Sequence, residues 1–287
     1  MSRFYLGSFC GAPIHVSFWT VAYFAYCILE ACHDSQLPTW FILSFAILCQ
    51  LVLQGTILVH EFGHGFMARH LGGTIHSILL WPFGGICSIS MPQTESRYVK
   101  ISNELKIVCA GPATHIFQTF FWIKLVNICY TDMHVVQLLN PFTSGTAVSE
   151  LSMSSLLLLV MVQAIKVNVL LFLFNALFPM YPMDAAKMLV SLLQLCFGFT
   201  PKTTAKSLVG FSGISSLLFI AYFTYLSLTS SASRIHLQMS VILGCMCFGE
   251  VLNLLRLISD DKLHEHPLFT EQVEVEQESA PFIKSKV

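Results

Sequence analysis

The segment TILVHEFGHGF, residues 56–66, places two histidines and a glutamate in a run that is otherwise suited to a lipid bilayer. Residues 39–59, TWFILSFAILCQLVLQGTILV, contain no charged side chain. An ionised side chain inside the hydrocarbon core of a membrane is costly unless it is paired or has a function. We therefore take His60, Glu61 and His64 as the first candidates for a functional site.

The composition of the whole chain indicates an integral membrane protein. Of the 287 residues, 55% are hydrophobic and only 11% are charged, and the mean hydropathy is +0.69. Soluble domains contain about 25% charged residues. We therefore expect the chain to lie in a lipid bilayer. The formal net charge of −1 argues against a nucleic-acid partner.

Six apolar stretches are long enough to cross a bilayer as a helix, which takes roughly 20 residues. They lie at about 14–31, 39–66, 105–128, 153–178, 207–229 and 236–258. Residues 185–199 are apolar but too short to span easily, and we expect a helix that follows an interruption. The sequence thus predicts an all-α polytopic membrane protein with about six transmembrane helices.

A shorter segment, residues 74–90, lies between the second and third expected helices. Its centre, Pro82–Phe83–Gly84–Gly85, consists of turn-forming residues between two β-prone arms. We expect a short β-hairpin or a re-entrant segment here. Residues 1–262 form the predicted membrane domain, whereas the polar, Glu-rich residues 263–287 are expected to form a flexible cytosolic tail.

The positions of lysine and arginine predict the orientation, because these residues concentrate on the cytosolic side of membrane proteins. With the N-terminus in the cytosol, only Lys124 and Arg234 fall on the opposite side, and Lys166 lies within a span without an explanation. Six spans also return the C-terminus to the cytosol. Neither a cleavable signal peptide nor a transit peptide is recognisable, so we expect ER or Golgi membranes if the cell is eukaryotic.

The spacing of the two histidines suits a metal site. Residues i and i+4 of a helix lie on one face, so His60 and His64 can direct two imidazoles at one ion. Glu61 lies beside that face. In zinc hydrolases with this H-E-x-x-H arrangement, zinc lowers the pKa of a water from ~15.7 to ~7 and the glutamate acts as the base. The motif can arise by chance, but three ionisable groups so close together in an apolar run favour a metal.

A catalytic zinc site usually has three protein ligands and one open position. Asp184 is the only aspartate between apolar segments, in FNALFPMYPMDAAKML, residues 174–189. Pro179 and Pro182 interrupt the helix there and shape a turn that presents Asp184. Glu250 is the rival acid, and no comparable turn precedes it.

HEFGH at 60–64 together with NALFPMYPMD at 175–184 resembles the site-2 protease family of intramembrane metalloproteases. The usual family pattern is H-E-x-x-H followed much later by N-x-x-P-x-x-x-x-D-G. Here three residues rather than two separate Asn175 from Pro179, and Ala185 stands where glycine is usual. His115 stands where the asparagine of a G-P-x-x-N motif is common. Further similar segments are GAPIHVSF (11–18), ARHLG (68–72), WPFGG (81–85) and AGP (110–112).

The resemblance implies a role for each residue of the motifs. His60, His64 and Asp184 would ligate Zn²⁺, and Glu61 would be the catalytic acid and base. The implied reaction is regulated intramembrane proteolysis, in which a peptide bond within or near the transmembrane helix of a single-span membrane protein is hydrolysed.

The substrate must be unwound before it can be cut, because a helix hides its carbonyls in hydrogen bonds. We expect the hairpin, with Gly84 and Gly85, to offer the unwound segment a strand edge, and Asn175 to hydrogen-bond its backbone. The alternative for Asn175 is a contact between helices of the bundle. For His115 a buried core position and a substrate contact both stay open.

Two other classes of protein also stay open. A membrane zinc protease of the prenyl-protein-processing kind would take its third ligand from Glu250 rather than Asp184. A non-enzymatic metal transporter or regulator would show ionisable residues along a pathway or a repeated half. The sequence has no visible internal repeat.

Overall fold

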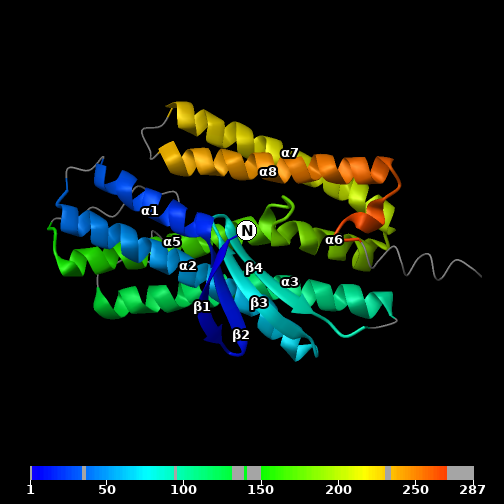
Figure 1. Ribbon diagram of the computed structural model, residues 1–287, viewed down its shortest axis with the longest axis horizontal. Coiled ribbons are helices and arrows are strands. Elements are labelled where there is room, and N and C mark those ends of the chain that lie inside the picture. The colour runs from blue at the N-terminus through cyan, green and yellow to red at the C-terminus, as the bar shows by residue number, and fades with distance from the viewer. Residues whose placement is uncertain are drawn as a thin grey trace, which may run out of the picture. The chain divides into compact units, whose positions relative to one another are not determined.

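A computed structural model describes residues 2–33, 37–93, 96–130, 139–140, 150–229 and 234–269 of the chain. Its elements are shown in Figure 1. In chain order they are β1 (Arg3–Phe9), β2 (Ala12–Ser17), α1 (Phe18–His33), α2 (Thr39–His70), β3 (Thr74–Trp81), β4 (Gly84–Ser90), α3 (Arg97–Cys129), α5 (Met153–Leu177), α6 (Asp184–Phe197), α7 (Pro201–Thr229), α8 (Arg234–Ser259) and the 3-10 helix η1 (Leu263–Glu265). The chain divides into two compact units, one formed by Met1–Pro92 with Cys109–Leu173 and the other by Gln93–Val108 with Phe174–Val287.

Four helices in the described part of the chain are long and apolar enough to cross a membrane. They are Thr39–His70, Met153–Leu177, Pro201–Thr229 and Leu237–Ser259, and each matches one of the six expected spans. The expected span 14–31 begins in β2 and continues in α1, which is a shorter apolar helix. Residues 105–128 lie in α3, which is helical but is not among the four. The membrane character is therefore confirmed, and the number of six spans stays a prediction.

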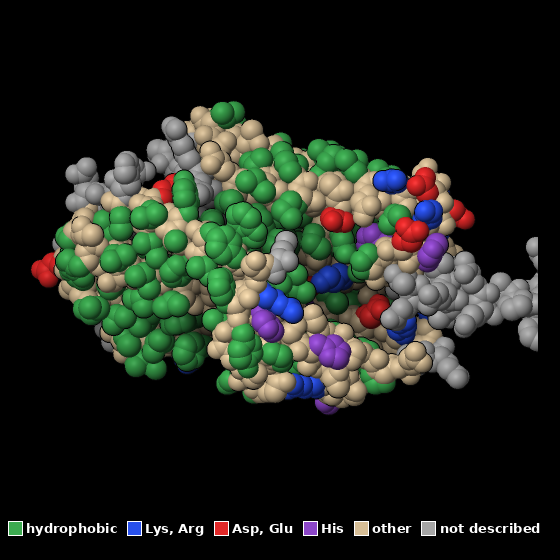
Figure 2. Space-filling view, in the orientation of Figure 1, with side chains coloured by type: hydrophobic (Ala, Val, Ile, Leu, Met, Phe, Trp, Pro, Cys, Tyr) green, Lys and Arg blue, Asp and Glu red, His purple; other side chains and the backbone are tan. Residues whose placement is uncertain are grey.

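Many hydrophobic side chains lie on the outside of these helices. Leu29 of α1, Leu51 of α2 and Phe117 of α3 are all exposed. Figure 2 shows that hydrophobic side chains cover most of the visible face over α1 and α2. Apolar surface of this extent is unfavourable in water and favourable in a bilayer, because burial in an apolar medium stabilises it in proportion to its area.

The four strands form one sheet in the order β1-β2-β3-β4 within the first unit. The predicted hairpin at residues 74–90 is confirmed, since β3 and β4 pair antiparallel from Thr74 with Ser90 to Trp81 with Gly84. A second antiparallel hairpin, β1–β2, was not predicted, and β2 runs parallel to β3. The chain is mostly helical as expected, and the sheet is larger than the single predicted hairpin because β1 and β2 add to it.

Helix α2 packs against the sheet close to its H-E-x-x-H segment. Ile57 and Phe62 of α2 share a buried hydrophobic core with Ile14 of β2 and with Ile78 and Leu80 of β3. These contacts flank His60 and Glu61 on both sides along the helix. The sheet therefore fixes the part of α2 that carries the candidate metal ligands.

In the second unit, α5 ends at Leu177 and α6 begins at Asp184, so the interruption predicted from the two prolines is confirmed. Helices α6, α7 and α8 share a buried core with the chain that follows α8. Its members are Ala186, Val190, Ala205, Leu208, Leu254, Leu263 and Phe269. Residues 270–287 of the expected tail lie outside the described residues, whereas Leu263, His266 and Phe269 at its start are buried.

Candidate metal centre

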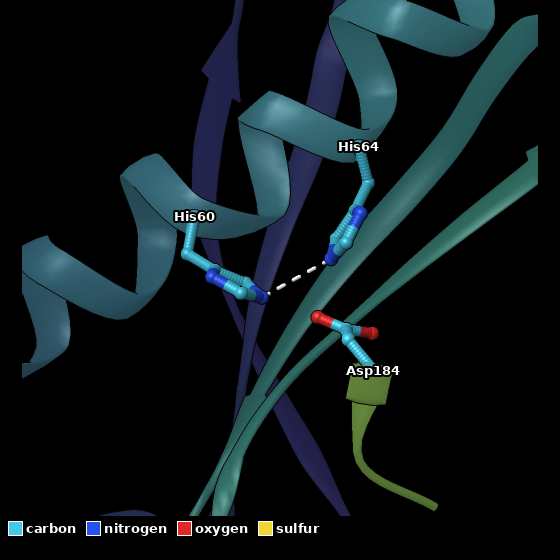
Figure 3. A group of neighbouring side chains, drawn as sticks. All are labelled: His60, His64 and Asp184. Carbon is cyan, nitrogen blue, oxygen red and sulfur yellow. Dashed lines mark hydrogen bonds between the residues drawn. The ribbon is translucent and has the colours of Figure 1, made fainter. Parts of the chain in front are cut away.

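Helix α2 directs both histidines of the motif to one point. Their Nε2 atoms lie 3.1 Å apart, and Figure 3 shows the two rings pointing toward each other from successive turns. His60 and His64 are buried, with exposed fractions of 6% and 8%. The i, i+4 spacing therefore produces the convergence that the sequence predicted.

Asp184 is the first residue of α6, and its side chain is buried with 4% exposed. The partial positive charge at a helix N-terminus stabilises a carboxylate at this position. Lys187, one turn further along α6, places its Nζ atom 3.2 Å from Oδ1 of Asp184. Both features place positive charge beside the carboxylate, and a carboxylate binds metal in its ionised form.

His60, His64 and Asp184 form a buried group that could hold a metal ion (Figure 3). Each offers one ligand atom, and these three atoms lie within 4.8 Å of one another. Two imidazole nitrogens and one carboxylate oxygen are the donors of many catalytic zinc sites, so this donor set fits zinc. Glu250, the rival third ligand, is not part of the group, which contains Asp184 instead.

Glu61 lies beside this group on α2, and its side chain is 6% exposed. The backbone of Gly85, in β4, lies directly against it: a Cβ atom added at Gly85 would come within 2.6 Å of Oε1 of Glu61. A side chain at position 85 would therefore displace the carboxylate. Of the predicted substrate-binding residues, Gly85 is the one that lies against Glu61.

The other two predicted substrate-binding residues lie on different elements. Gly84 begins β4 with a φ of +150°, a backbone conformation that other residues rarely adopt, and it pairs with Trp81 across the turn of the hairpin. Asn175 lies in the last turn of α5 and is half-buried. Their contact with a substrate stays a prediction.

Gly111, in α3, is a residue of the site that the sequence did not reveal. A Cβ atom at this position would lie 2.9 Å from Nε2 of His60 and even closer to the ring of His64. Only glycine therefore leaves room for the two imidazoles. The AGP tripeptide at 110–112 was the available signal, but nothing in the sequence links it to α2.

The thiol of Cys87, in β4, lies near Glu61 but is not among the three candidate metal ligands. Burial raises the pKa of Cys87 to about 12, the Glu61 carboxylate acts in the same direction, and Arg69 opposes both. Cys87 is not part of the buried group formed by His60, His64 and Asp184. The candidate metal site therefore consists of nitrogen and oxygen donors.

A buried His-His-Asp group whose histidines lie on an H-E-x-x-H helix has the ligand arrangement typical of zinc metalloproteases, here in a chain with four helices, among its described residues, that are long and apolar enough to cross a membrane. The model of peptidase family M50 matches residues 48–220, more than half of the chain. The chain therefore belongs to this family, the site-2 protease family, and zinc is its cofactor.

Two known proteins are similar to this chain over shorter segments. One is stage IV sporulation protein FB of Bacillus subtilis (strain 168), to which the chain is 30% identical over 93 residues. This match covers 32% of this chain and 30% of that protein. The chain is 26% identical over 161 residues to the zinc metalloprotease MJ0392 of Methanocaldococcus jannaschii, which covers 56% of this chain and 38% of the relative. The matched segments thus span less than two fifths of each relative's length.

The fold is similar to a solved structure, the site-2 protease from Methanocaldococcus jannaschii. The TM-score is 0.53 at 19% sequence identity, and the match covers 88% of this chain and 94% of that chain. The likeness in fold therefore extends over most of both chains.

Proposed function

We propose that the protein is an intramembrane zinc metalloendopeptidase that hydrolyses a peptide bond within or near a transmembrane helix of a single-span membrane protein, as in regulated intramembrane proteolysis. The observation that carries this proposal is the buried group of His60, His64 and Asp184, whose two histidines lie in a helix long and apolar enough to span a membrane. A substrate that reaches this site must itself be accessible from the bilayer.

Zinc bound by these three residues would supply Lewis acidity, which makes a water molecule more acidic and polarises a carbonyl group. Glu61 follows His60 in the chain and is held in place by the close approach of Gly85. Its carboxylate would accept a proton from the attacking water and pass it to the leaving amine nitrogen. Burial of Glu61 excludes bulk water that would otherwise compete for this proton.

The hairpin β3–β4 suits the recognition of an unwound substrate. Strand β4 is the last strand of the sheet in the described part of the chain, and Gly85, its second residue, lies directly against Glu61. An extended peptide that pairs with β4 would satisfy its backbone groups by main-chain hydrogen bonds. Asn175 would provide a further hydrogen bond to the exposed backbone.

The alternative of a prenyl-protein-type protease is not favoured, because the metal-binding group includes Asp184 and not Glu250. A metal transporter would need ionisable groups along a path through the membrane. In the described residues, the candidate ligands converge on one buried group instead.

The proposal is tested by removing the metal. The purified protein is incubated with a panel of single-span membrane proteins in detergent or vesicles, with and without a zinc chelator. Cleavage should require zinc, disappear after chelation and return when zinc is restored, because water activation depends on the metal. Cleavage that persists in a protein shown to be zinc-free would refute the proposed mechanism.

We also propose that both termini face the cytosol, in ER or Golgi membranes if the cell is eukaryotic. A glycosylation acceptor inserted at residues 132–145 should then be modified in the lumen. An acceptor inserted at residues 92–102 should not be modified, because this segment, with Arg97 and Lys100, would face the cytosol. The opposite pattern of modification would invert the topology.

A further inference from the structure

A chain of buried polar side chains leads away from the metal centre through α2, α3 and α5. Nδ1 of His60 lies 3.0 Å from Nε2 of His115, and Nδ1 of His115 lies 3.0 Å from Oδ1 of Asn168. The amide nitrogen of Asn168 donates to the carbonyl oxygen of Ala164 at 2.9 Å and approaches the hydroxyl of Thr56 at 3.5 Å. His115, Asn168 and Thr56 are at most 3% exposed.

The hydrogen bonds in this chain have one consistent direction. The carbonyl of Ala164 can only accept, so the amide group of Asn168 faces it as the donor. Oδ1 of Asn168 therefore faces His115 and accepts a hydrogen bond from its Nδ1. A neutral imidazole that donates through one nitrogen accepts through the other, so Nε2 of His115 accepts from Nδ1 of His60.

This direction determines which nitrogen of His60 is available to a metal. With its proton on Nδ1, His60 carries a lone pair on Nε2. Nε2 is the atom that lies 3.1 Å from Nε2 of His64, within the metal-binding group. The carbonyl of Ala164 thus sets the tautomer of a candidate ligand through two intervening side chains.

We propose that His115 and Asn168 are positioning residues that hold His60 in the tautomer and ring orientation in which Nε2 binds zinc. The proposal rests on the proposed role of His60 as a zinc ligand. Partners that orient a metal-bound histidine contribute typically 10–100-fold to metal affinity. A polar contact that serves only helix packing would not act selectively on the metal.

The test measures the zinc dissociation constant of the full-length protein in detergent by competition with a chelator. His115→Phe keeps a flat ring but removes the acceptor, and it should weaken zinc binding about 10–100-fold. His115→Gln retains an acceptor near the position of Nε2, so the loss should be no more than roughly threefold. Asn168→Leu leaves both histidines in place and removes the acceptor for Nδ1 of His115, together with the contacts of Asn168 to Ala164 and Thr56, so it should weaken binding about tenfold.

Two control variants distinguish a failure of the positioning role from a failure of the zinc site itself. His76→Phe, in β3, makes the same change at an exposed histidine and should leave zinc affinity unchanged. His60→Ala should abolish zinc binding, and normal binding by that variant would refute the proposed zinc site itself. If His60→Ala loses zinc while His115→Phe and Asn168→Leu bind it as tightly as the unmodified protein, the positioning role is refuted and the zinc site stands.

A spectroscopic readout separates positioning from stability. Cobalt(II) substituted for zinc should show a changed visible absorption spectrum in His115→Phe and an unchanged spectrum in His76→Phe, because the spectrum reports ligand geometry. If His115→Phe does not fold, Asn168→Leu decides the question, since it retains both histidines. An unaltered cobalt spectrum together with unaltered zinc affinity in Asn168→Leu would refute the proposal.

Discussion

Asp184→Ala should lower the zinc content of the purified protein well below one ion per chain and abolish proteolysis. The change removes the carboxylate oxygen from the buried group and leaves two histidines on one helix. A catalytic zinc site normally has three protein ligands. The lost negative charge also weakens the attraction for a divalent cation, and this effect is large where water is excluded. Zinc content is measured by metal analysis of protein purified in detergent.

Glu250→Gln is the matched control for Asp184→Ala. It also removes one carboxylate, but from a residue of α8 that is not part of the metal-binding group. Zinc content and proteolysis should stay close to those of the unmodified protein. If Glu250→Gln lost zinc and Asp184→Ala retained it, the prenyl-protein-type alternative would replace the present proposal.

The part of the fold that depends on local sequence could be predicted. Apolar runs of sufficient length predicted the four helices that can span a membrane, because the bilayer thickness sets their length. The turn residues between Trp81 and Gly85 predicted the hairpin β3–β4, and Pro179 and Pro182 predicted the interruption before Asp184. Each of these features has its physical cause within about twenty neighbouring residues.

The features that depend on distant pairing could not be predicted in this way. The strand β2 was assigned to an apolar span because it is short and its pairing partner, β3, lies some sixty residues further along the chain. Gly111 contacts the metal-binding histidines and Asn168 contacts His115, yet each is separated from its partner by about fifty residues. A single sequence gives the spacing within a helix, but not which face of another helix lies opposite.

The site shows the same division between local and distant information. His60, Glu61 and His64 follow from helical periodicity alone, so the motif predicted their convergence. The glycines that make room for them, Gly85 and Gly111, come from β4 and α3. The two histidines and the glutamate are therefore readable from one helix, whereas the third candidate ligand, Asp184, and the space around the centre are provided by other elements.

Glu61→Gln should lower the rate of proteolysis by a factor of roughly 10²–10⁴, the usual contribution of a general acid or base. Glutamine has nearly the same shape, so it should fit beside Gly85 without disturbing the packing. Its amide oxygen cannot take up the proton of the attacking water. Because Glu61 is not among the three candidate ligands, zinc content should stay near one ion per chain.

The measurement compares substrate cleavage and zinc content in the same preparations of Glu61→Gln and the unmodified protein. Glu265→Gln, at an exposed position in η1, is the control for the loss of a carboxylate and should leave both quantities unchanged. Loss of cleavage with zinc retained would distinguish the role of Glu61 as a base from the role of the metal ligands. Asp184→Ala cannot make this distinction, because that variant is expected to lose zinc and cleavage together. Cleavage by Glu61→Gln at the unmodified rate would mean that another group accepts the proton, and the assignment of Glu61 would be withdrawn.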